Sequence, residues 1–280
     1  MGVSDPPSDN RRDNGEHRPT TAAGRLLALL GAFAHDEGAL RLSDLSRRSG
    51  LSLTTTHRLI QELLAWEGVE LTTSGHYRLS SKFLELASIS TQGLRLRETA
   101  LPYLVDLQRR TGLTVHLAAR EGASVMNLEA LRLHPNYGGV NRIGGRVQLH
   151  VGASGLVLLA HAAEDFIEAY LGEPLASYTP ATITDPATLR ATLATIREQG
   201  YAVCRDTPVA DRAMVAAPVM NLDGEVEAAI GLICWLDRHD PDRYIEAVRT
   251  TAQRVSRAFA QRSPQPTART LAFRQQLPSQ

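Results

Sequence analysis

Apolar residues recur at helical spacing in the region from residue 20 to about 82. Leu26, Leu27, Leu30 and Phe33 are spaced so that they share one side of a helix. The following stretch, LRLSDLSRRSG, predicts a second, shorter helix with Ser43 as its N-cap and Leu45 facing inward. Gly50 stands where a left-handed C-terminal residue is expected. These patterns predict two helices that end in a tight glycine turn.

The stretch GLSLTTTHRLIQELLAWEG, residues 50–68, predicts a third helix directly after that turn. Wound at about 100° per residue, its buried side holds Thr56 with Leu59, Ile60 and Leu63. Its opposite side holds Thr54, Arg58 and Gln61, with Thr55 and His57 on the flanks. We expect the Thr56 hydroxyl to donate to the Ser52 carbonyl. The exposed hydroxyl, guanidinium and amide groups suit the major groove of DNA.

A hairpin is predicted after the third helix. VELTTSGHYRL alternates apolar and polar residues around a Ser74-Gly75 turn. Helix, glycine turn, helix and hairpin together predict a winged helix-turn-helix, with the helix-turn-helix at 43–62 and the wing at 69–79. The expected DNA contacts are Arg47, Arg48, Ser52, Thr54, Thr55, His57, Arg58, Gln61, His76 and Arg78. The competing interpretation is a merely solvated polar face, but the combination of elements favours DNA binding.

The pattern changes once further along the chain. Residues 83–96 predict a linker helix, and from residue 97 strands and helices alternate up to about 262. Hairpins are expected at Glu121-Gly122 and Asp223-Gly224, a helix near Ala153, and another helix capped by Asp185. The fold class is therefore α+β: a winged helix-turn-helix domain at 20–82, a linker helix, and a larger second domain at 97–262.

Composition narrows the class of protein. Hydrophobic residues make up 43% of 280, and the formal net charge is zero, so any nucleic-acid contact must come from a local patch. Residues 1–19 and 263–280 are polar and are predicted to be disordered tails. No apolar run approaches the roughly 18 residues of a membrane span. With only two cysteines, Cys204 and Cys234, we expect a cytoplasmic protein without membrane contact.

Enzymatic and metal-dependent functions find little support in the motifs. Gly152-Ala153-Ser154-Gly155 resembles the start of a nucleophile elbow, but Leu156 replaces its final glycine. The histidines are scattered without the spacing of metal ligands. We therefore predict no catalytic residues, no metal and no cofactor. Cys204 and Cys234 are either a redox pair, if the strands bring them together, or small core residues.

Five segments resemble the IclR family of bacterial transcriptional regulators. They are LSDLSRRSGLSLTTTHRLIQEL, GHYRL, RVQLHVGASGLVLLA, TPATITDPATLRATLATIREQGYAV and VAAPVMNLDGEVEAAI. The resemblance covers about 20–262 and implies a GAF-like effector-binding domain after the linker helix. It also implies a homodimer or homotetramer on a pseudo-palindromic double-stranded operator.

The resemblance also implies an effector site, in which this chain departs from the family pattern. The matching positions are Ala153, Ser154, Cys204, Met214, Gly231 and Ile233. Relatives that sense small carboxylates carry polar side chains at several of these positions, including two serines where Gly231 and Ile233 stand here. We therefore expect a larger, more apolar effector with one or two polar anchors. The expected function is a DNA-binding regulator that acts as a repressor and responds to this effector; the alternative is a dimeric regulator with a degenerate domain that senses no metabolite.

Overall fold

The computed structural model describes residues 21–34, 38–89, 92–132 and 143–262. Their chain divides into two compact units between Thr91 and Gln92. The two predicted tails, 1–19 and 263–280, lie outside the described residues. Each unit has its own hydrophobic core.

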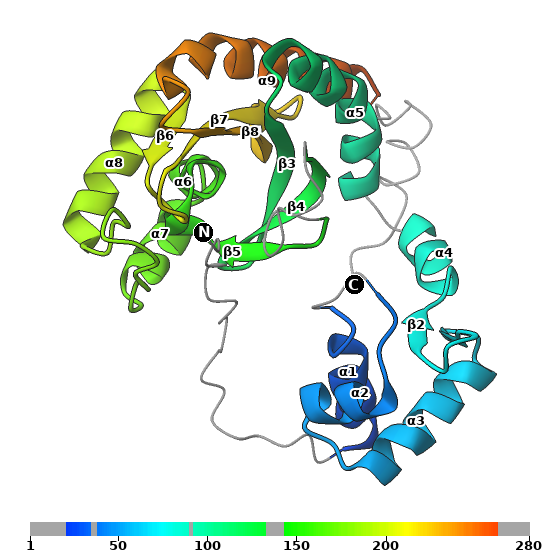
Figure 1. Ribbon diagram of the computed structural model, residues 1–280. Helices are drawn as coiled ribbons and strands as arrows, with labels where there is room; N and C mark the ends of the chain where they lie inside the picture. Colours follow the sequence, from blue (N-terminus) through cyan, green and yellow to red (C-terminus); the bar gives the residue numbers. More distant parts are fainter. Residues whose placement is uncertain (1–20, 35–37, 90–91, 133–142, 263–280) are drawn as a thin grey trace, which may run out of the picture. The chain divides into compact units, whose positions relative to one another are not determined.

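The N-terminal unit is a three-helix cluster followed by a two-stranded hairpin and a short helix (Figure 1). Its elements are α1 (Ala22–Gly31), α2 (Leu42–Ser49), α3 (Leu53–Ala65), β1 (Val69–Leu71), β2 (Tyr77–Leu79) and α4 (Lys82–Ile89). The three helices and β1 bury one core that contains Leu29, Leu45 and Ile60. The turn between α2 and α3 depends on Gly50, whose φ of 68° is left-handed. This confirms the predicted winged helix-turn-helix.

Two details of this unit differ from the prediction. Ser43 lies inside α2, and the N-cap is Arg41, which makes no side-chain cap. The reason is a backbone bridge between Leu40 and Tyr77, which holds the chain extended until Arg41. In the hairpin, the apolar alternation does not bury every apolar side chain: Val69 is buried, whereas Leu71 is 56% exposed.

The C-terminal unit is built on a six-stranded antiparallel sheet of order β5-β4-β3-β8-β7-β6. The strands are β3 (Thr114–Glu121), β4 (Ser124–Leu131), β5 (Arg146–Gln148), β6 (Ala202–Arg205), β7 (Arg212–Met220) and β8 (Val226–Trp235). The helices are α5 (Gln92–Thr111), α6 (Ala153–Ala160), α7 (Glu164–Leu171), α8 (Pro186–Gln199) and α9 (Ile245–Arg262), with short 3-10 helices at Leu149–Val151 and Pro241–Tyr244. This confirms the predicted α+β class.

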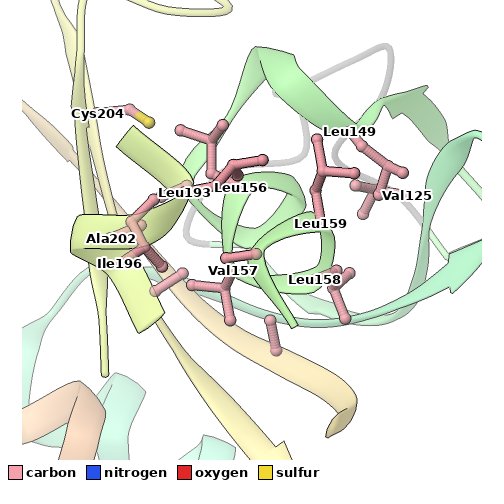
Figure 2. Packing of buried hydrophobic residues seen from close by; sticks show 14 of the residues in the cluster. Val125, Leu149, Leu156, Val157, Leu158, Leu159, Leu193, Ile196, Ala202 and Cys204 are labelled. Atoms are coloured by element: carbon pink, nitrogen blue, oxygen red, sulfur yellow. The ribbon is translucent and has the colours of Figure 1, made fainter. Parts of the chain in front are cut away.

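Helices cover both faces of the sheet (Figure 1). One core joins α5 and α9 to the sheet and includes Leu104, Ile230 and Val255. The other core joins α6, α7 and α8 to the opposite face, and every residue of α6 is buried in it. Figure 2 shows Leu193 and Ile196 of α8 beside Leu156 and Val157 of α6. The sheet face under α6 is therefore the interior in which the predicted effector residues must be sought.

The structure adds three findings to the predicted organisation. Helix α5 runs unbroken across residue 97, so the boundary that we placed between the linker helix and the second domain falls inside one helix. Helix α7 was not predicted. In the described ranges, no helix is long and apolar enough to cross a bilayer.

The two cysteines do not form a redox pair. Cys204 pairs across strands with Met214, whereas Cys234 pairs with Ala213. Met214 and Ala213 are neighbours in one strand and point to opposite faces of the sheet. Accordingly, Cys204 belongs to the core under α6 and Cys234 to the core under α5 and α9.

Candidate functional sites

The N-terminus of α3 is held by side chains that also decide which of the three threonines face outward. Ser52 is the N-cap, and its Oγ accepts from the Thr55 amide at 3.3 Å. The Thr56 hydroxyl is buried and donates to the Ser52 carbonyl at 2.9 Å, as predicted. Ser52 Oγ in turn donates to Thr55 Oγ1 at 2.9 Å. The Thr55 hydroxyl thus keeps its own proton for an outside acceptor such as a phosphate oxygen.

The exposed surface of α3 consists of polar side chains one turn apart. We call it the recognition surface; its members are Thr54, His57, Arg58 and Gln61, all exposed. Arg58 has no hydrogen bond or ion pair to any residue that the structure describes. Its guanidinium is therefore available, without breaking an existing contact, for the guanine or phosphate contacts that Arg makes in the major groove.

Other predicted DNA-contacting cations already have partners on the surface. Arg47 pairs with Asp44 at 2.8 Å, and its side chain is 74% exposed. Arg78 pairs across the wing with Glu70 at 2.7 Å. Arg48 is also exposed. Exposed pairs of this kind contribute only about 0–1 kcal/mol, so Arg47 and Arg78 can exchange a carboxylate for a phosphate at little cost.

His76, one of the predicted DNA contacts, has hydrogen-bond partners within the chain. Its Nδ1 lies 3.0 Å from the Ser74 carbonyl oxygen, and its Nε2 accepts from Arg41 Nε at 3.2 Å. The tautomer with the proton on Nδ1 satisfies both contacts. His76 therefore orients Arg41 beside the wing, and Arg41 becomes a candidate DNA contact that the sequence analysis missed. Arg41 and His76 are 35 residues apart in the sequence, so no local pattern indicates that they are in contact.

The predicted effector residues come together under α6. Cys204, Met214 and Ile233 are cross-strand neighbours on β6, β7 and β8. Gly231 lies in the adjacent row, opposite Ala216 on β7. Ala153 and Ser154 begin α6 and are fully or almost fully buried. The six positions thus share one interior, and most of their side chains are apolar.

A histidine that the sequence analysis did not single out lies beside two members of this group, Ser154 and Gly231. His116 on β3 is 3% exposed and is the cross-strand partner of Gly231. Its Nε2 lies 2.8 Å from Ser154 Oγ. A Cβ atom on residue 231 would lie 2.2 Å from His116 Cε1 and 2.6 Å from Ser154 Oγ. Only glycine leaves room for this pair.

Burial fixes the protonation of the interior groups. It lowers the pKa of His116 from 6.5 to about 4, so the imidazole is neutral at pH 7. It raises the pKa of the Cys204 thiol to about 12, which keeps the thiol protonated.

A serine beside a histidine also fits a hydrolase dyad, so the pair needs a chemical test. A catalytic imidazole is oriented by a third group on Nδ1 and titrates near neutral pH. His116 Nδ1 has no hydrogen-bond partner among the described residues, and its lowered pKa makes it a weak base. The pair lacks the features of an activated nucleophile.

A cavity of about 330 Å³ adjoins this interior between α6, α8 and β6. Cys204 is the one effector candidate among its lining residues, which also include Leu156, Ile183, Ile196 and Thr207. The Thr207 hydroxyl is already used, because it donates to the Val151 carbonyl at 2.8 Å. His150 also lines the cavity and is held by Tyr170 and the Ala176 carbonyl. The lining of the cavity is thus partly apolar. It includes Cys204 on β6, the strand that pairs with the Met214 strand, β7.

Two family profiles match the chain. The profile "IclR helix-turn-helix domain" matches residues 22–71, and "Bacterial transcriptional regulator IclR C-terminal" matches residues 89–257. Together they span most of the described residues.

Individual relatives agree with these profiles. The HTH-type transcriptional regulator XynR of Escherichia coli K12 is 34% identical over 77% of this chain and 86% of its own length. The DNA-binding transcriptional repressor YiaJ of the same organism is 27% identical over 83% of this chain and 85% of its own. An IclR homolog from Microbacterium hydrocarbonoxydans, crystallised with 4-hydroxybenzoate, has a TM-score of 0.77 and 32% identity over 84% of this chain and 97% of its own. These relatives are regulators and not enzymes.

Proposed function

The chain belongs to the IclR family of bacterial transcriptional regulators, and we propose that it is a cytoplasmic repressor released from its operator by a small molecule. As a member of this family it is a DNA-binding regulator with a ligand-binding C-terminal domain. Repression is supported by the relative YiaJ, which is named a repressor. The DNA-binding part is assigned to residues 20–82 and the effector part to 97–262, with α5 continuing from the linker into the second part.

The observation that carries the DNA-binding part is the exposed guanidinium of Arg58 on the recognition surface, which has no partner among the described residues. In the proposed complex α3 lies in the major groove, where Arg58 contacts guanine and Gln61 contacts adenine. The phosphates are contacted by Thr54, Thr55, Arg47, Arg48 and Arg78. Arg41, next to the wing, also contacts a phosphate. A single such unit contacts too few base pairs for tight binding, so two copies on a pseudo-palindromic operator are proposed.

The proposed effector has an apolar body larger than pyruvate and one or two polar groups. Met214 and Ile233 contribute no side-chain donor of any strength, and the Cys204 thiol stays protonated. A small carboxylate would therefore be buried with few donors, which is costly. The 4-hydroxybenzoate bound by the Microbacterium relative combines an aromatic body with a hydroxyl and a carboxylate, so it supports the size and aromatic character of the proposed ligand.

A second candidate function is a regulator whose C-terminal domain senses no metabolite. It is favoured by one observation: five of the six effector candidates do not line the 330 Å³ cavity, and Met214 is largely buried. In that case the domain serves only to assemble the protein on DNA.

The experiment begins by selecting a duplex from a random pool with the full-length protein. Fluorescence anisotropy of that duplex is then followed while the complex is titrated with pyruvate and glyoxylate, or with 4-hydroxybenzoate and other aromatic compounds. We expect release by at least one aromatic compound and none by the small acids. Release by millimolar pyruvate alone would contradict the proposed ligand class. No response, together with no thermal stabilisation by any compound, would favour the second candidate.

A further inference from the structure

His116 carries a buried polar atom that has no partner among the residues the structure describes. Its Nε2 is fixed by Ser154 Oγ at 2.8 Å, whereas its Nδ1 is buried with no hydrogen-bond partner in the described part of the chain. Buried polar atoms without partners are rare in native proteins, and each calls for an explanation such as a bound group.

His116 lies next to predicted effector residues, so its Nδ1 atom belongs to the effector interior. Two effector candidates adjoin the imidazole: Ser154 Oγ lies 2.8 Å from Nε2, and a Cβ built on Gly231 would lie 2.3 Å from the same atom. The imidazole therefore fills the space that a serine at position 231 would occupy.

We propose that His116 Nδ1 is the polar anchor of the effector and that it binds one neutral hydroxyl or carbonyl group carried on an apolar body. This inference rests on the proposed function and specifies its ligand. His116 acts as a binding residue, and Ser154 is the positioning residue that holds the imidazole.

The chemistry follows from the two tautomers of the pair. If Nε2–H donates to Ser154 Oγ, Nδ1 is an acceptor for a ligand hydroxyl. If the Ser154 hydroxyl donates to Nε2, Nδ1–H is a donor for a ligand carbonyl. Because the lowered pKa keeps the imidazole neutral, neither state provides a positive charge for a carboxylate. The ligand is therefore selected for an uncharged polar group at this point.

Space for the ligand comes from Met214. Cys204 lines the cavity and its cross-strand neighbour is Met214, whose sulfur would lie 3.2 Å from a Cβ built on Gly152 at the start of α6. Methionine is unbranched and readily changes rotamer. In the proposed complex, rotation of Met214 would open space across β7 towards Gly231 and His116.

The test compares probes of equal size with and without the neutral polar group. The pairs are p-cresol with p-xylene and acetophenone with cumene, and benzoate serves as the charged probe. Titration calorimetry on the full-length protein should give at least one polar probe about tenfold tighter binding than its hydrocarbon partner and than benzoate. With ¹⁵N-labelled histidine, the polar probe should shift the Nδ1 resonance of His116, and p-xylene should not.

Two variants separate the two ring nitrogens. His116→Gln keeps a polar atom near Nε2 and removes Nδ1, so it should abolish the preference for the polar probe. His116→Asn keeps a polar atom near Nδ1 and should retain the preference. Ser154→Ala should weaken it by releasing the ring. Melting temperature and affinity for the selected duplex confirm that each variant is folded. If a variant does not fold, the ¹⁵N measurement on the wild type still tests the inference.

Three results would overturn the inference: no preference for a polar probe in the wild type, the same preference in His116→Gln, or an unchanged Nδ1 resonance. These failures differ from a failure of the proposed function. If the probes bind and release DNA equally in the wild type and in the residue-116 variants, the inference about His116 is wrong and the proposed function stands. If the protein selects no duplex from the pool, the proposed function fails whatever the probes do.

Discussion

Replacement of Gly231 by alanine is the most direct probe of the buried His116–Ser154 pair. The new Cβ would lie 2.2 Å and 2.3 Å from His116 Cε1 and Nε2, and 2.6 Å from Ser154 Oγ, where ordinary contact begins near 3.4 Å. The imidazole must move by about 1 Å and give up its bond to Ser154. Overpacking costs about 1–3 kcal/mol, and a lost buried hydrogen bond about 1 kcal/mol more. We expect the free energy of unfolding to fall by about 2–4 kcal/mol.

Urea denaturation followed by far-UV circular dichroism measures this loss as a lower midpoint at unchanged slope. Gly93→Ala is the matched control, because it makes the same replacement in the same unit. A Cβ on Gly93 would meet only Leu128 Cδ2, at 3.7 Å. Since Gly93 lies in α5, alanine there should be neutral or stabilising by up to about 1 kcal/mol.

A double-mutant cycle identifies the clashing group. In a His116→Ala background the new Cβ meets no imidazole and clashes only with the Ser154 hydroxyl, which can rotate away, so Gly231→Ala should cost less there. The expected coupling energy is about 2 kcal/mol. An equal cost in both backgrounds would refute the packing argument, as would a cost in the wild type no larger than that of Gly93→Ala.

Three further predictions concern DNA binding, pH and assembly. Arg58→Ala should weaken binding of the selected duplex by about 1–3 kcal/mol if Arg58 contacts a base, or reduce the salt slope by about one if it contacts a phosphate; Arg47→Ala should have the smaller effect, and an unchanged affinity and slope in Arg58→Ala would contradict the assignment. Because the pKa of His116 falls from 6.5 to about 4 on folding, the unfolded chain binds its proton first, so stability is full above pH 6.5 and falls by about 3 kcal/mol as pH drops to about 4. His116→Gln should lack this part of the pH dependence in urea denaturation, and identical profiles would refute it. Light scattering at micromolar concentration should give a dimer or tetramer, and a monomeric mass with intact operator binding would rule out paired half-sites.

The sequence by itself determined the local elements and the faces they present. A period of about 3.6 residues placed Thr56 in the core and Arg58 outside, and both lie there in the structure. Gly50 in the turn and Asp223-Gly224 between β7 and β8 were readable because left-handed backbone is a local preference of glycine. Such features depend on residues within one turn or one hairpin of each other, so a single sequence contains the information.

Only the tertiary structure decided which distant residues meet. His116, Ser154 and Gly231 come from β3, α6 and β8, and they converge because β3 pairs with β8 in one register. A shift of that register by one residue would turn His116 to the other face. Pairing between distant segments likewise puts Cys204 and Cys234 on opposite faces of the sheet and brings Arg41 beside His76. Pairing between distant strands follows from how whole faces pack together, and no periodicity within one segment encodes it.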